Sequence, residues 1–194
     1  HDQERLMVDK WTYRFHPPSR GDVIVFLSPP KAGEPNTDFV KRIIAIPGDV
    51  VTIRGTTVIV DGAALNETYI NPIEQGAGGN PVENLVVPPD NYFVMGDHRS
   101  DSFDSRYWGF LPLDNIIGRV VLVYWPLGKD NDGLLPNVSP VFANVSQDFI
   151  VPSHSAKPTQ NTRKILYAST VLLCLAPVLV IGIRAKRRRK ANLK

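Results

Sequence analysis

The stretch DFVKRIIAIPGDVVTIRGTTVIVDG, residues 38–62, contains three short runs of apolar and β-branched residues separated by Pro, Gly and Asp. Runs of this length and composition predict β-strands. Within the stretch, VTIRGTTVIVDG predicts a hairpin that turns near Arg54 and Gly55, and the Asp61-Gly62 pair predicts a second tight turn. We therefore expect antiparallel strands here.

Similar runs lie on either side of this stretch, for example GDVIVFL at 21–27 and RVVLVYW at 119–125. No long window outside residues 165–183 shows the periodicity of an amphipathic helix. A chain of 194 residues is long enough for one sizeable core. The expected fold is mainly β, with one antiparallel β-sheet domain over residues 1–128.

The C-terminal part of the chain has a different composition. Residues 165–183, ILYASTVLLCLAPVLVIGI, carry no charge, and RAKRRRK follows at once. This length and these flanks predict a transmembrane helix with a basic cytoplasmic tail, residues 184–194. A buried core helix is the alternative, but such helices rarely run this long without charge. Residues 129–164, rich in Pro, Asn and Ser, are expected to form a tether.

The net charge of +3 is unevenly distributed along the chain. Seven basic and no acidic residues lie from position 184 onward, which leaves 15 basic and 19 acidic residues in the rest. A nucleic-acid-binding domain needs its basic excess on the folded part. The charge pattern therefore argues against nucleic acid and leaves membrane lipid as the expected contact of the tail.

Lys41 and Arg42 are adjacent in an otherwise apolar strand, so their side chains should point to opposite faces and only one should face the core. Phe39, Ile43 and Ala45 share the face of Lys41. Apolar surroundings disfavour the charged amine and lower its pKa, which makes a lysine a usable base. Spacing alone leaves open the alternative that Lys41 extends to solvent from an edge strand.

Four segments in order resemble the blocks of the bacterial type I signal peptidases, which are membrane-bound Ser–Lys endopeptidases that remove signal peptides. The segments are SRGDVIVF (19–26), FVKRIIAIPGD (39–49), VDGAALNETYI (60–70) and MGDHRSDSFDSRYWG (95–109). The resemblance extends from about residue 5 to residue 125. It implies a β-rich catalytic domain on the extracytoplasmic side of the cytoplasmic (plasma) membrane, acting on signal peptides of exported preproteins without a cofactor.

The resemblance also implies roles for single residues. Lys41 matches the general base that activates a serine nucleophile without any histidine. Ser102 matches a hydroxyl that hydrogen-bonds and orients the lysine amine. Asp104 and Arg106 match an ion pair that holds the loop of this serine.

Gly96 and Asp97 match the start of the same block, where the strand is expected to turn tightly. Asp38, Phe39 and Val40 match substrate-binding positions, where a peptide could add as a strand. For Phe39 and Val40, ordinary core packing is an alternative of nearly equal weight.

The nucleophile itself is expected in an S-M-x-P-T-L type stretch upstream of ERLMVDKW (4–11), preceded by a first membrane anchor. The printed sequence starts too late to contain either. An inactive, membrane-anchored relic of the same fold is therefore the alternative function. A calcium site at Asp97, Asp101 and Asp104 is a further alternative, disfavoured because the spacing lacks the calcium-loop register and arginines lie nearby, so no metal is expected.

Overall fold

The computed structural model describes residues 5–33, 37–71, 73, 80–125, 133–146 and 179–181. Its strands form a seven-stranded sheet with the order β11-β1-β10-β2-β3-β8-β9 and a four-stranded sheet with the order β6-β5-β4-β7. All the strand pairs are antiparallel, which confirms the prediction of a mainly antiparallel β fold.

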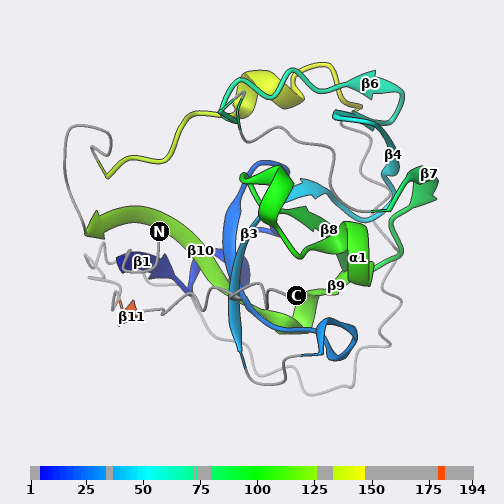
Figure 1. Ribbon diagram of the computed structural model, residues 1–194. Helices are drawn as coiled ribbons and strands as arrows, with labels where there is room; N and C mark the ends of the chain where they lie inside the picture. Colours follow the sequence, from blue (N-terminus) through cyan, green and yellow to red (C-terminus); the bar gives the residue numbers. More distant parts are fainter. Residues whose placement is uncertain are drawn as a thin grey trace, which may run out of the picture.

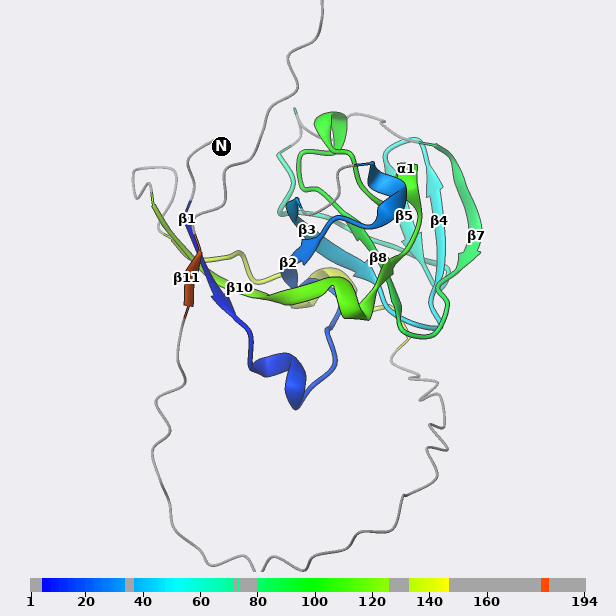
Figure 2. The same cartoon turned by 90° about the horizontal axis from the view of Figure 1, so that it is seen from below.

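The strands of the larger sheet are β1 (Arg5–Asp9), β2 (Val23–Leu27), β3 (Asp38–Ala45), β8 (Asn91–Met95), β9 (Leu111–Pro112), β10 (Ile116–Trp125) and β11 (Leu179–Ile181). Those of the smaller sheet are β4 (Val50–Arg54), β5 (Thr57–Val60), β6 (Ala63–Ala64) and β7 (Val82–Val86). The helices in the described ranges are short: η1 (Thr12–Arg14), η2 (Pro30–Ala32), η4 (Arg99–Asp101), α1 (Ser105–Trp108), η5 (Leu113–Asn115) and η6 (Ser139–Phe142). Figures 1 and 2 show β1 and β11 at one end of the molecule and β4 and β7 at the other, with β10 running from the first end towards the middle.

Both predicted turns are present in the smaller sheet. Arg54 pairs with Thr57, so a two-residue loop joins β4 to β5. Val60 pairs with Ala63 across the second turn, where Asp61 and Gly62 both have positive φ, 50° and 79°. Two successive residues of positive φ match the twist of the flanking strands, which is why Asp-Gly is a strong turn signal.

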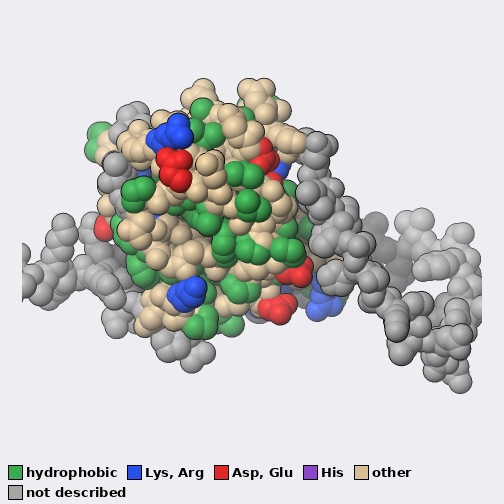
Figure 3. Space-filling view, turned by 90° about the vertical axis from the view of Figure 1, so that its right-hand side faces the viewer, with side chains coloured by type: hydrophobic (Ala, Val, Ile, Leu, Met, Phe, Trp, Pro, Cys, Tyr) green, Lys and Arg blue, Asp and Glu red, His purple; other side chains and the backbone are tan. Residues whose placement is uncertain are grey.

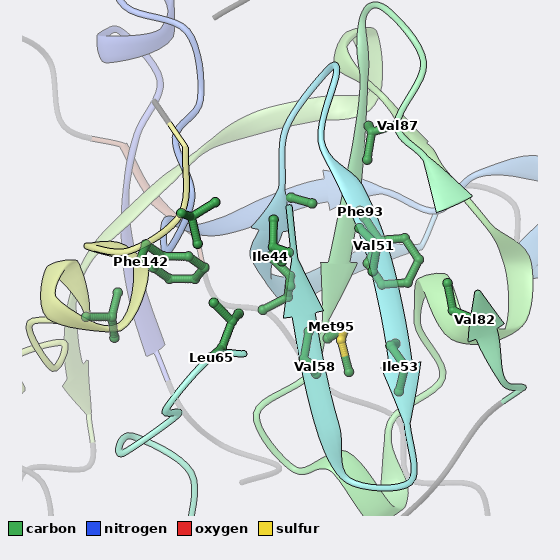
Figure 4. Close-up of a cluster of buried hydrophobic side chains, with 14 residues drawn as sticks. Ile44, Val51, Ile53, Val58, Leu65, Val82, Val87, Phe93, Met95 and Phe142 are labelled. Atoms are coloured by element: carbon green, nitrogen blue, oxygen red, sulfur yellow. The ribbon is translucent and has the colours of Figure 1, made fainter. Parts of the chain in front are cut away.

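Strand β3 is covered on both faces. On one face Ile44 packs with Val51, Val58 and other residues of the smaller sheet (Figure 4). On the other, Ile43 packs against residues of β2 and β8 and against Trp108. The register shifts after Ile43, so Ala45 belongs to the cluster of Ile44 and not to that of Ile43, unlike the simple alternation predicted.

Part of the segment predicted as a tether is packed on the core. Val138, Phe142 and Val145 are buried at 9%, 5% and 2% exposure. Phe142 lies close to Leu65 and Ile44 (Figure 4). The other residues of the predicted tether, 129–132 and 147–164, lie outside the described residues.

Of the predicted membrane span, residues 165–183, the structure describes only β11. These three residues are extended, not helical, and pair with Leu6, Met7 and Val8 of β1 (Figure 2). One edge of β1 pairs with β10, which leaves the opposite edge available for the apolar strand β11. Within the described ranges, no helix combines the length and apolar character that a membrane crossing requires. The rest of the predicted span and the basic tail lie outside these ranges.

One face of the molecule carries few basic side chains in its described part. On the described part of the face in Figure 3, hydrophobic and uncharged side chains prevail, and the basic side chains are few and separate. Nucleic-acid binding uses a basic patch or stripe. This face lacks one in its described part.

Candidate active site

Lys41 lies in the middle of β3, opposite Ile24 of β2. Its side chain is half-buried, and its Nζ donates a hydrogen bond of 2.9 Å to Ser102 Oγ. Ser102 lies 61 residues further along the chain and is 8% exposed. The fold therefore brings the two together inside the protein, and Lys41 does not extend freely into solvent.

The close approach depends on Gly96, which directly follows β8. A Cβ at this position would overlap Ser102 Oγ, lie 2.7 Å from Ser102 Cβ and lie 3.3 Å from Lys41 Nζ. Carbon atoms separated by 2.7 Å repel strongly. The absence of a side chain at residue 96 is what leaves room for the Lys41–Ser102 contact.

Asp104 and Arg106, which follow Ser102 on the same loop, form a fully buried ion pair. The guanidinium makes two hydrogen bonds of 2.8 Å to the carboxylate, one to each oxygen. The Gly96 amide donates to Asp104 Oδ2 at 3.0 Å. Arg106 also donates to the Arg99 carbonyl at 2.9 Å, so the pair ties together both ends of the loop that carries Ser102.

Burial and the nearby charges set the protonation of Lys41. Burial, the largest effect, lowers the pKa of the amine below its ordinary value of 10.5; Asp104 opposes this, and Arg106 reinforces it. Burial by itself would raise the pKa of Asp104, but the hydrogen bond and charge of Arg106 outweigh it and keep this pKa below 3.8. Asp104 thus stays ionised while Lys41 is pushed towards its neutral form.

The hydrogen bonds give Ser102 a fixed direction. Its Oγ accepts from the Lys41 amine at 2.9 Å, and its carbonyl accepts from the Arg106 guanidinium at 3.4 Å. A neutral amine that donates one N–H to Ser102 keeps its lone pair free for another proton. The arrangement can therefore orient a base.

Arg42 departs from the expectation that only one of the two cations faces the core. It is 3% exposed, and its guanidinium makes hydrogen bonds of 2.9 and 2.7 Å to Asp97 and one of 2.9 Å to the Gly21 carbonyl. The ring of Tyr69 lies 4.4 Å from the guanidinium carbon. Because both faces of β3 are covered, both cations are held inside, each by different partners.

The substrate-binding positions expected at Asp38, Phe39 and Val40 form the first part of β3. Phe39 packs edge-on against Phe26, and Val40 packs against the cluster of β1 and β10, so both side chains contribute to the core. Their backbone is different. Strand β2 pairs along residues 38–42 on one edge, whereas the pairing with β8 begins only at residue 42. Among the described residues, no strand pairs with the other edge of residues 38–41.

The calcium alternative requires Asp97, Asp101 and Asp104 to converge on one cation. In the structure, Asp97 forms an ion pair with Arg42, and Asp104 forms one with Arg106. Two of the three carboxylates are thus already neutralised by arginine. This arrangement opposes a calcium site.

Two buried residues escaped prediction. Glu67 and Arg99 form an ion pair with side chains only 6% and 5% exposed. Neither has a local sequence signal, because the partners are 32 residues apart and each stands among polar neighbours. Only the long-range contact reveals that they are inside.

A family described as "Signal peptidase, peptidase S26" matches residues 1–125, which hold all the residues of this site. The chain belongs to this signal peptidase family. Signal peptidase I of Leptolyngbya laminosa is 40% identical over 131 residues, covering 65% of this chain and 62% of that protein. Signal peptidase I of Bacillus caldolyticus is 36% identical over 131 residues, covering 62% and 69%.

A solved signal peptidase I from Enterococcus faecalis V583 is 30% identical, with a TM-score of 0.45, and the match covers 54% of this chain and 97% of that one. Of the L. laminosa relative, the chain spans about three fifths of the length. Family membership agrees with the resemblance of the four sequence blocks.

Proposed function

We propose that this protein is a membrane-bound serine endopeptidase, a hydrolase that removes N-terminal signal peptides from exported preproteins. Lys41 is the general base, and the nucleophile is a serine outside the 194 residues. Ser102 orients the amine, and Asp104 and Arg106 hold Ser102 in place. The observation that carries the proposal is the half-buried Lys41 amine hydrogen-bonded to Ser102 at 2.9 Å.

The chemistry follows from the protonation of Lys41. In water, a lysine is almost entirely protonated at neutral pH and cannot accept a proton. Here burial lowers the pKa of the amine, which increases the neutral fraction. A serine hydroxyl placed near the free lone pair would lose its proton to Lys41 as it attacks the scissile carbonyl, and the resulting ammonium would then protonate the leaving amine.

The substrate would bind by strand addition. Among the described residues, no strand pairs with the second edge of residues 38–41, which lies beside the general base. An extended peptide can pair with such an edge and present its scissile bond to neighbouring side chains. Signal peptides end in small residues of the A-x-A type, which suit a crowded site at this edge. In this proposal Asp38, Phe39 and Val40 bind substrate through their backbone.

We further propose that residues 165–183 anchor the enzyme in the cytoplasmic membrane, with residues 184–194 in the cytoplasm and the catalytic domain outside. The support is the length of the uncharged segment and the basic cluster that follows it.

The test is cleavage of a preprotein with an A-x-A site by the full-length protein, expressed from a gene that includes the upstream codons. Lys41→Ala should abolish cleavage because it removes the base. Lys41→Arg should be equally inactive, because arginine cannot be deprotonated in a protein. The exposed Lys31→Arg is the matched control and should retain full activity. Near-normal activity of Lys41→Arg would disprove the role of the base, and no cleavage by the unchanged protein would favour the inactive relic.

A further inference from the structure

The loop that carries Ser102, residues 96–106, contacts the segment that follows β6 of the smaller sheet. Arg99 of this loop donates through Nη1 to Glu67 Oε2 at 2.5 Å and through Nη2 to Glu67 Oε1. Its Nε donates to the Gly96 carbonyl at 3.2 Å. A two-bonded arginine–carboxylate pair constrains both position and orientation. Glu67 thus holds Arg99, and Arg99 holds the start of the loop.

The segment around Glu67 is itself well anchored. It directly follows β6, and Leu65 and Ile70 on either side are 9% and 4% exposed. The Leu65 amide donates to the Val58 carbonyl at 2.9 Å. Because Leu65 belongs to the core cluster of the smaller sheet and Ile70 is also buried, Glu67 is a firm support for the loop.

Tyr69 links the same segment to the other cation of β3. Its hydroxyl donates to Glu67 Oε1 at 2.6 Å, and its ring contacts Arg42, which in turn binds Asp97. Burial followed by the charge of Glu67 raises the pKa of this hydroxyl, so it stays protonated and donates. The segment therefore supports the loop at two points, through Arg99 and through Asp97.

A continuous set of contacts leads from here to the amine. The Arg99 carbonyl accepts from Arg106 Nη2 at 2.9 Å, and the same nitrogen donates to the Ser102 carbonyl at 3.4 Å. Ser102 Oγ in turn accepts from the Lys41 amine. We propose that Glu67 and Arg99 are positioning residues. Their buried ion pair fixes the loop to the segment that follows β6 and so holds Ser102 against the amine of Lys41.

The significance of this inference rests on the proposed function, but its test needs no peptidase activity. The probe is trace labelling of lysines with acetic anhydride across a pH series, read by peptide mass spectrometry, on the chain as printed. The acylation of Lys41 reports its neutral fraction, which Asp104, Arg106, Asp97 and Asp101 also influence. The exposed Lys31 is the internal reference.

Glu67→Gln should loosen the loop, expose the Lys41 amine to water and shift its labelling midpoint upward by about one pH unit. The matched control is Asp49→Asn, which breaks another buried pair, with Arg20, whose side-chain hydrogen bonds do not involve residues 96–106. It should lower stability without moving the Lys41 midpoint.

Tyr69→Phe covers the case in which Glu67→Gln fails to fold. It removes one hydrogen bond to Glu67 and should shift the midpoint in the same direction by less. If the folded variants lose stability but leave the Lys41 midpoint unchanged, the pair is merely structural and the inference is wrong. A full-length protein that cleaves no signal peptide would overturn the proposed function without altering this result.

Discussion

Lys41 is the residue on which the chemistry depends, and its environment sets up a conflict. Burial disfavours the ammonium, whereas the nearby carboxylate of Asp104 favours it. Arg106 resolves the conflict because its two hydrogen bonds neutralise Asp104 locally. The amine is thus left with Ser102 as its closest polar partner.

Ser102→Ala in the full-length protein should reduce cleavage roughly tenfold to a hundredfold, because loss of one orienting hydrogen bond is worth about 1–3 kcal/mol. The effect is measured as kcat/KM, from the rate of cleavage at substrate concentrations below KM. Ser100→Ala, an exposed serine on the same loop, is the control and should have no effect. Equal rates for both variants would show that Ser102 does not orient the base.

The sequence predicted this residue pair through its resemblance to a family, not through spacing. Alternation along the strand places Lys41 and Arg42 on opposite faces, but it could not show that Arg42 is buried as well, among Asp97, the Gly21 carbonyl and the Tyr69 ring. Glu67 and Arg99 were missed for the same reason. A buried charge is visible in sequence only when its partner is nearby in the chain.

At the scale of elements, the loop between β8 and α1 owes its shape to Asp104. The carboxylate accepts from the Gly96 amide at one end and caps the Arg106 amide at the other. Ser105 adds a link, since its Oγ accepts from the Val94 amide of β8 at 2.9 Å. The loop is therefore closed by buried polar contacts more than by apolar packing.

Asp104→Asn should destabilise the protein by about 3–5 kcal/mol at neutral pH, because it leaves Arg106 buried without its counter-charge. The pKa of Asp104 is lower in the folded state than 3.8, so its contribution is complete above about pH 4 and is lost as the pH falls through the folded pKa. Urea unfolding at a series of pH values checks both points.

The difference between wild type and Asp104→Asn should therefore shrink in acid. Asp114→Asn, at an exposed position, should behave as wild type throughout. A difference for Asp104→Asn that stays constant down to pH 2 would contradict an ionised carboxylate at this position.

The elements themselves were largely predictable. The hairpins were foreseen because their turns depend on local residues, such as Asp61-Gly62. The register shift after Ile43 was not, because it depends on how β8 pairs with β3.

At the scale of the whole molecule, residues 133–146 close one end of the core. Their composition predicts a tether, yet three apolar side chains spaced four and three residues apart, at 138, 142 and 145, are buried. Their burial depends on a surface built by residues 21, 44 and 65. Long-range packing of this kind overrides local composition, which is why the sequence pattern missed it.

Phe142→Ala should lower the free energy of unfolding by about 3–5 kcal/mol, since it removes a buried aromatic side chain and leaves a cavity. Thermal or urea unfolding measures the loss. Phe15→Ala, whose ring is 74% exposed, is the matched control and should change stability little. Similar stabilities for the two variants would mean that residues 133–146 do not belong to the core.

The central claim is that the fold raises the neutral fraction of the Lys41 amine and orients it as a base. Its most direct test is the pH dependence of kcat/KM for cleavage of an A-x-A preprotein by the full-length protein. The account predicts that activity rises with pH to a plateau whose midpoint lies below 10.5, the ordinary pKa of a lysine amine. It also predicts that Ser102→Ala, which removes the partner that orients the amine, lowers the plateau. Activity that keeps rising to pH 10.5, or a plateau that Ser102→Ala leaves unchanged, would contradict it.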